Sequence, residues 1–98
     1  MMVLHVFAKN RNMATEIARE LFNQKLIFNA SIHANATTFE QTGTELIEKD
    51  MTLLTVIGKA MNYPEATALI NQMFPNDKPV FYAIPVINYN NAAKSLPT

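Results

Sequence analysis

Apolar and polar residues are arranged along the chain in four stretches that each predict a strand. A short apolar run predicts a buried strand over residues 2–8, and alternation predicts a strand with one polar face over residues 26–38. A third strand, over residues 46–57, carries apolar residues on both faces. A last apolar run predicts a strand over residues 80–87, in which Pro85 marks an edge, a bulge or the strand's end.

Between these strands lie two segments with apolar residues at helical spacing. The first spans residues 13–24, with Asn12 as the expected N-cap and an apolar stripe of Ala14, Ile17, Ala18 and Leu21. The second begins at Asn62-Tyr63-Pro64-Glu65, which has the spacing of a capping box, and ends before Pro75. A short helical turn is expected at Ala92–Leu96. Residues 40–44 form the hairpin loop between the second and third strands.

The resulting order of elements, β-α-β-β-α-β, predicts one α+β domain over residues 1–98. Each strand–helix–strand unit should cross over with right-handed connectivity. Two such units joined by a hairpin give a ferredoxin-like sandwich. We therefore expect a four-stranded antiparallel sheet with both helices on one face and a long central hairpin.

The sheet face away from the helices is expected to be an interface. The strands at residues 2–8, 51–57 and 80–87 carry large apolar residues on both faces, whereas a water-facing side would normally be polar. Burying one such side chain is worth about 1.5–3 kcal/mol. We expect other copies of the chain to cover this face in a closed ring, although composition does not choose between a dimer and a trimer.

Composition excludes several classes of function. Lys+Arg and Asp+Glu both number 8, and the absence of a basic run argues against nucleic-acid binding. The chain has no Cys, so thiolate metal sites and disulfides are excluded. No apolar run is long enough to span a membrane, and the first residues lack a signal-peptide pattern, so a cytoplasmic location is expected.

Two segments of the chain resemble the CutA (divalent-ion tolerance) family. Residues 14–32 are similar to a helix that leads into the family's second strand, through Ile17, Ala18, Leu21, Leu26, Ala30 and Ile32. Residues 73–86 are similar to the family's proline signature, through Pro75, Pro79, Ala83, Pro85 and Val86. Gly43 falls at the family's hairpin glycine, and the resemblance extends over about residues 2–96.

This resemblance implies a homotrimer whose hairpins extend across neighbouring subunits, within the superfamily of the PII signalling proteins. It also implies an association with divalent-metal tolerance and copper binding. Several polar positions of the family are replaced here: its Cys by Asn29, its His and Tyr by Phe74 and Asn76, and its Glu by Val80. The acidic residue that precedes this Glu in the family is retained as Asp77.

His33 is the main candidate metal ligand. It shares the polar strand face with Asn29, Ser31 and Asn35, and one imidazole from each of three subunits could hold Cu or Zn. The simpler interpretation is a hydrogen-bonded polar residue at a subunit contact, because no second ligand is near in sequence. His5, inside an apolar strand, is interpreted as a satisfied core or interface histidine.

Asp77 is the candidate from the turn after the second helix. The resemblance implies that this turn lies beside an inter-subunit cleft, and ordinary turn chemistry is the alternative. No set of nucleophile, base and orienting acid is visible, so the chain is not expected to be an enzyme. The leading hypothesis is a trimeric CutA-like protein that binds a divalent metal or a small ligand. The alternative is a PII-like signalling or interaction module that binds a small metabolite in inter-subunit clefts.

Overall fold

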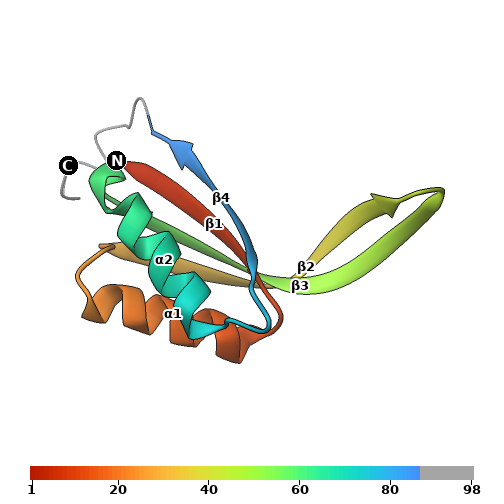
Figure 1. Ribbon diagram of the computed structural model, residues 1–98, viewed down its shortest axis with the longest axis horizontal. Coiled ribbons are helices and arrows are strands. Elements are labelled where there is room, and N and C mark those ends of the chain that lie inside the picture. The colour runs from red at the N-terminus through yellow and green to blue at the C-terminus, as the bar shows by residue number, and fades with distance from the viewer. Residues whose placement is uncertain (87–98) are drawn as a thin grey trace.

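Strands and helices follow one another in the predicted order in this computed structural model, which describes residues 1–86 (Figure 1). The helical turn expected at Ala92–Leu96 lies outside the described residues. The elements are β1 (Met2–Ala8), α1 (Arg11–Asn23), β2 (Asn29–Thr42), β3 (Glu45–Gly58), the 3₁₀ turn η1 (Ala60–Asn62), α2 (Tyr63–Met73) and β4 (Val80–Pro85).

The four strands form one antiparallel sheet in the order β2-β3-β1-β4. Each crossover therefore skips one strand, because β3 lies between β1 and β2, and β1 lies between β3 and β4. Both helices cover the same face of the sheet (Figure 1). This arrangement confirms the ferredoxin-like fold expected from the order of elements.

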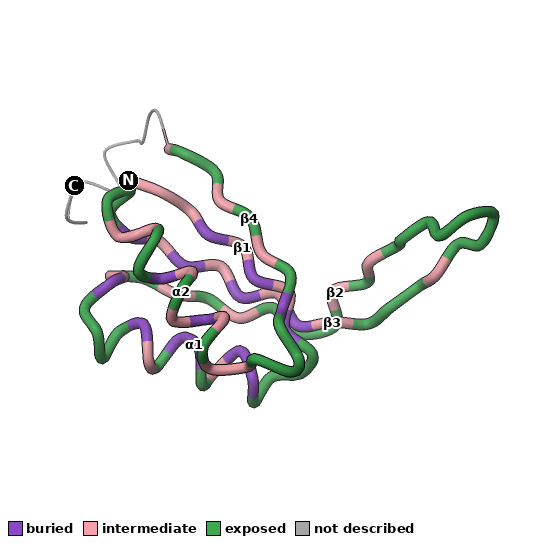
Figure 2. Tube along the Cα trace, in the orientation of Figure 1, coloured by how far each residue is buried: buried purple, intermediate pink, exposed green. Residues whose placement is uncertain are grey.

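The hydrophobic core lies between the helices and the covered face of the sheet (Figure 2). The stripe of α1 is buried as predicted, at Ala14, Ile17, Ala18 and Leu21. On α2, Ala66 and Ile70 are buried, and they face the inward-pointing side chains of β1 and β3, which are Leu4, Val6, Leu54 and Val56. Within the described residues, no helix is long and apolar enough to cross a membrane.

The first helix begins two residues earlier than its apolar spacing suggested. Asn10, and not Asn12, is the N-cap: its Oδ1 accepts a hydrogen bond of 2.8 Å from the Met13 amide. Asn10 also has the extended backbone that an N-cap requires. Asn10 and Asn12 are chemically equally suitable as N-caps. The choice between them depends on where β1 ends and the chain turns into the helix.

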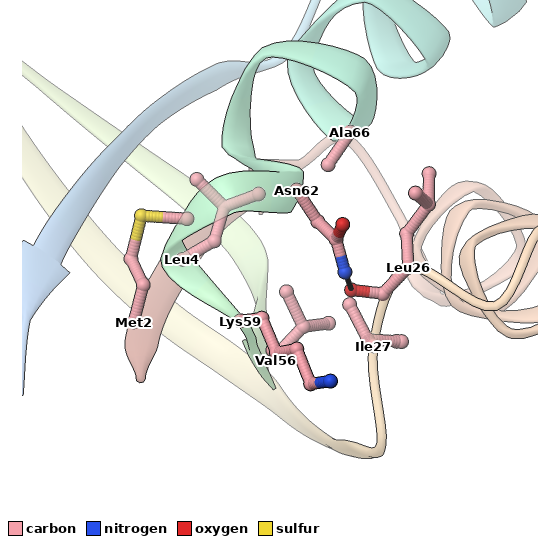
Figure 3. A pocket seen from close by; sticks show the side chains of 9 residues that line it. Met2, Leu4, Leu26, Ile27, Val56, Lys59, Asn62 and Ala66 are labelled. Atoms are coloured by element: carbon pink, nitrogen blue, oxygen red, sulfur yellow. Dashed lines mark hydrogen bonds between the residues drawn. The ribbon is translucent and has the colours of Figure 1, made fainter. Parts of the chain in front are cut away.

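The second helix lacks the expected capping box. Asn62 has helical backbone angles, and its side chain makes no capping hydrogen bond. Its Nδ2 instead donates to the Leu26 carbonyl at 3.2 Å, which ties η1 to the segment before β2 (Figure 3). This bond lies against an apolar cavity of about 10 Å³. Gly58 is required nearby, because a Cβ at this position would lie 2.5 Å from the Leu26 carbonyl oxygen.

The β2–β3 hairpin projects from the sheet as a long arm (Figure 1). Toward the turn its strands extend beyond the predicted limits, whereas β2 begins at Asn29 and not at residue 26. The turn contains only Gly43 and Thr44 rather than residues 40–44. Polar residues continue the pairing because backbone hydrogen bonds form whatever the side chains are. Gly43 has φ +64°, the positive value that two-residue hairpin turns require at their first central position.

The last strand is shorter than predicted and ends at Pro85, on the edge of the sheet. A proline cannot donate a ladder hydrogen bond, so it is tolerated at both an edge and a strand end. The Val86 amide still donates to the Met1 carbonyl at 3.1 Å. Ile87, which the apolar run included in the strand, lies outside the described residues.

Candidate functional site

Neither helix covers the sheet face opposite to them (Figure 1), and its side chains on β3, β1 and β4 are mostly apolar. The strand register arranges its side chains in three transverse rows. From β2 to β4, the rows are Asn29–Ile57–Val3–Ile84, then Ser31–Thr55–His5–Tyr82, and then His33–Leu53–Phe7–Val80. We call these twelve residues the open face. Its β4 side chains are exposed, with Val80 at 68%, Tyr82 at 48% and Ile84 at 45%.

The middle row of the open face is polar. His5 Nδ1 lies 3.3 Å from Thr55 Oγ1, within hydrogen-bond distance. On its other side, the His5 ring lies against Tyr82, with ring centroids 5.3 Å apart. His5 therefore lies on the open face and not in the core, and it has a polar partner there. The rows on each side are apolar on β3, β1 and β4 and carry Asn29 and His33 on β2, so polar groups occupy the middle row and the β2 edge of the face.

The predicted polar face of β2 is present as far as His33 and then breaks. Asn29, Ser31 and His33 share the open face, and His33 Nε2 lies 3.5 Å from Ser31 Oγ. A β-bulge follows between His33 and Ala36, and Asn35 adopts φ +61° within it. The expectation that Asn35 continues this alternation is therefore wrong, because an extra residue in one strand shifts the alternation by one.

The bulge also determines which side chains of the arm lie on the same side as the open face. Beyond it, Ala36 pairs with Met51 and Thr38 pairs with Lys49. Even-numbered residues of β2 thus take the side that odd-numbered residues occupied before the bulge. The sequence signal was Asn35 itself, because asparagine tolerates the left-handed region better than most residues.

Asp77 lies in a cleft of about 480 Å³ where the arm leaves the sheet. We call it the arm cleft. Its apolar lining includes Phe7, Phe39 and Val80, and the complete lining is Phe7, Lys9, Met13, Thr38, Phe39, Glu40, Lys49, Met51, Asp77, Lys78, Pro79 and Val80. Pro79, buried beside Lys78, restricts the backbone of that lysine to extended angles.

The charges of the arm cleft are largely paired. Lys9 Nζ lies 3.6 Å from Asp77 Oδ2, and Lys49 Nζ lies 3.4 Å from Glu40 Oε2. All four side chains are more than half exposed, so water screens both ion pairs. Asp77 therefore has a structural partner, and its carboxylate is not free to act alone.

The predicted site residues fall into two separate groups. His33, Asn29 and Ser31 lie on the open face, whereas Asp77 lies in the arm cleft, whose lining includes none of them. The hydrogen-bond partner of His33 is Ser31, and the ionic partner of Asp77 is Lys9. Residues 1–86 contain no group of three or more His, Asp or Glu side chains that could hold a metal ion. One protomer by itself therefore does not fit a resident metal in its described part.

These features define a class of protein: a ferredoxin-like sandwich with an extended β-arm and an uncovered apolar sheet face. Solved structures to which this chain is similar in fold include CutA1 divalent cation tolerance proteins. The protein from Thermus thermophilus is 21% identical, with a TM-score of 0.83, 97% of this chain covered and 93% of the other. That from Ehrlichia chaffeensis is 23% identical, with a TM-score of 0.80 and coverages of 93% and 85%. That from Oryza sativa is 17% identical, with a TM-score of 0.81 and coverages of 91% and 82%.

No family model matches the sequence, and no curated protein sequence matches it either. The likeness to CutA1 is thus a likeness of fold, over nearly the whole length of both chains. It confirms the fold that the resemblance in the two sequence segments implied.

Proposed function

We propose that this chain is a divergent CutA-like protein that works as a homotrimer in the tolerance of divalent cations and is not an enzyme. The observation that carries the proposal is the open face, a largely apolar sheet surface on a fold shared with the Thermus thermophilus CutA1 protein over 97% of the chain. A surface of this kind is unfavourable in water, and burial against other copies would remove it.

A metal site in this proposal requires more than one subunit. His33 lies at the β2 edge of the open face, so a neighbouring copy packed there could bring a second imidazole near it. Neutral imidazole is a suitable ligand for copper or zinc. We propose that copies of His33 supply the metal contact, with Asn29 and Ser31 as polar neighbours in the same contact.

Native mass spectrometry tests both parts of the proposal at once, because it reports the oligomer mass and the bound metal. We expect three times the 11.0 kDa chain mass, and uptake of Cu(II) or Zn(II) that is lost in His33→Ala. His5→Gln is the matched control, because it removes the other histidine from the same face and should retain the metal. A monomeric wild-type protein would contradict the assembly. A trimer that takes up no metal would support the proposed assembly and refute the metal role.

A PII-like module that binds a small metabolite is the second candidate. The observation that favours it is the arm cleft, which has both apolar walls and charged groups and a volume in the range of small-ligand sites. Asp77, with its partner Lys9, would orient a ligand there. Stabilisation of the protein against heat by a metabolite, with no stabilisation by metals, would favour this candidate over the first.

A further inference from the structure

A second cleft lies at the other end of the sheet, where α1 ends and η1 begins. Its volume is about 480 Å³, and it includes two lysines and no carboxylate in a lining of Phe22, Lys25, Leu26, Ile27, Phe28, Lys59, Met61 and Asn62. We call it the two-lysine cleft. Figure 3 shows that Lys59 and Asn62 come from the segment after β3, and Ile27 from the segment before β2. We propose that this cleft binds a small organic anion, a carboxylate or phosphate ester with an aromatic body.

The charges of this cleft are the first reason. Neither Lys25 nor Lys59 has an ion pair with any residue in the part of the chain that the structure describes, unlike Lys9 and Lys49 of the arm cleft. Two like charges at one cleft repel each other, and a bound anion would reverse this unfavourable interaction. The cleft therefore attracts an anion and disfavours a divalent cation.

The apolar walls are the second reason. Phe22 is 45% exposed and Met61 is 80% exposed, although both are large apolar side chains. Phe22 and Phe28 line the cleft together with the two lysines. An inorganic anion would leave these walls in water, whereas an aromatic body would cover them. The chemistry of the walls and that of the lysines together select one ligand class.

The backbone at Lys25 is the third reason. Lys25 has φ +59°, at the position after the end of α1 where glycine is usual. Its amide donates to the Phe22 carbonyl, and the Leu26 amide donates to the Leu21 carbonyl, which together close the helix. A lysine is strained in this conformation, so glycine would serve helix termination better. The sequence thus places a cation at a position where stability alone favours glycine.

This inference goes beyond the proposed function, because it concerns neither the open face nor the arm cleft. It therefore succeeds or fails independently of the trimer and of metal uptake. The strained lysine also gives a test in which binding and stability change in opposite directions. Lys25→Gly removes the cation and relieves the backbone, so a loss of binding could not result from unfolding.

The experiment is a titration of the full-length protein with phenyl phosphate, followed by amide shifts in two-dimensional NMR. We expect saturable shifts at the backbone around Lys25 and Lys59, and none with phenol at the same concentrations. Lys25→Gly and Lys59→Gln should each weaken binding by up to about fivefold, since an exposed ionic contact is worth up to ~1 kcal/mol. Lys25→Gly should melt at the wild-type temperature or above. Lys78→Gln, which removes a cation from the arm cleft, should bind within about twofold of wild type.

Three outcomes would overturn the proposal. The first is undiminished binding by Lys25→Gly. The second is inorganic phosphate binding as tightly as phenyl phosphate and weakening equally in Lys78→Gln, which would indicate an adventitious ion only. The third is binding to vesicles that contain phosphatidylglycerol without saturable binding of phenyl phosphate, which would assign the lysines to a lipid surface.

Discussion

Replacing Ile84 by lysine should dissociate the proposed trimer while leaving each protomer folded. Ile84 lies on the edge strand β4, 45% exposed, in the row that it shares with Val3 and Ile57. In a free protomer the ammonium group of the lysine reaches water beyond the strand. The free energy of unfolding of the protomer should therefore change by no more than about 0.5 kcal/mol, as for other surface substitutions.

The expected effect on assembly is much larger. Full burial of an isoleucine is worth about 1.5–3 kcal/mol, so the 45% of Ile84 that is still exposed contributes about 1 kcal/mol for each subunit. The row offers no carboxylate to the lysine, and an unpaired buried ion costs several kcal/mol, about 10 kcal/mol in total when it is repeated in three subunits. Because a trimer forms in two association steps, this is about 5 kcal/mol for each step, which raises the concentration at which the trimer dissociates by roughly a thousandfold or more.

Light scattering after size-exclusion chromatography measures this effect at micromolar concentration. The wild type should have three times the chain mass of 11.0 kDa, and Ile84→Lys should have the mass of one chain with an unchanged circular dichroism spectrum. Met61→Lys is the matched control, because Met61 is 80% exposed in η1, away from the open face, and should remain trimeric. A variant at Ile84 that keeps the wild-type mass would refute the idea that this face is the interface.

Four further substitutions test the local structure, with urea unfolding at one fixed protein concentration as the measurement. Asn10→Ala should cost about 1 kcal/mol through loss of the N-cap, while Asn12→Ala should cost less than about 0.5 kcal/mol; the reverse order would show that the cap is misassigned. Asn62→Ala should cost about 1–2 kcal/mol, because the half-buried Leu26 carbonyl loses its donor, and an unchanged midpoint would contradict the importance of this bond. Gly58→Ala should cost about 1–3 kcal/mol, because the new Cβ would lie 2.5 Å from the same carbonyl, and a neutral result would mean that the backbone there moves freely.

Much of the fold could be predicted from the sequence because hydrophobic spacing is a local property. The limits of β1 were predicted to the residue, and the buried stripe of α1 was predicted correctly. The two-faced apolar pattern of β3 also predicted the open face. In each case the signal lies in neighbouring residues, and the side-chain period follows directly from strand or helix geometry.

The site was less predictable because it depends on one extra residue in a strand. The bulge at Asn35 reverses the alternation of β2, so it pairs Thr38 with Lys49 at the arm cleft and removes Asn35 from the face of His33. Before the bulge is known, simple alternation is the natural interpretation of this stretch. The separation of Asp77 from His33 likewise follows from strand order, which no local spacing contains.

The pattern of residues along the chain was enough to establish the order of elements, the two buried helix faces and the presence of an apolar sheet face without a cover. These depend on periodicity and on the conformational limits of residues such as proline and glycine. Three features emerged only from the folded arrangement: which asparagine caps α1, that Asn62 bonds to Leu26 and not to its own helix, and that two lysines from separate segments share one cleft. The last two features join residues that are distant in the chain, and the first depends on where β1 ends. In all three cases the partner of a residue is therefore determined by tertiary packing and not by its neighbours in the sequence.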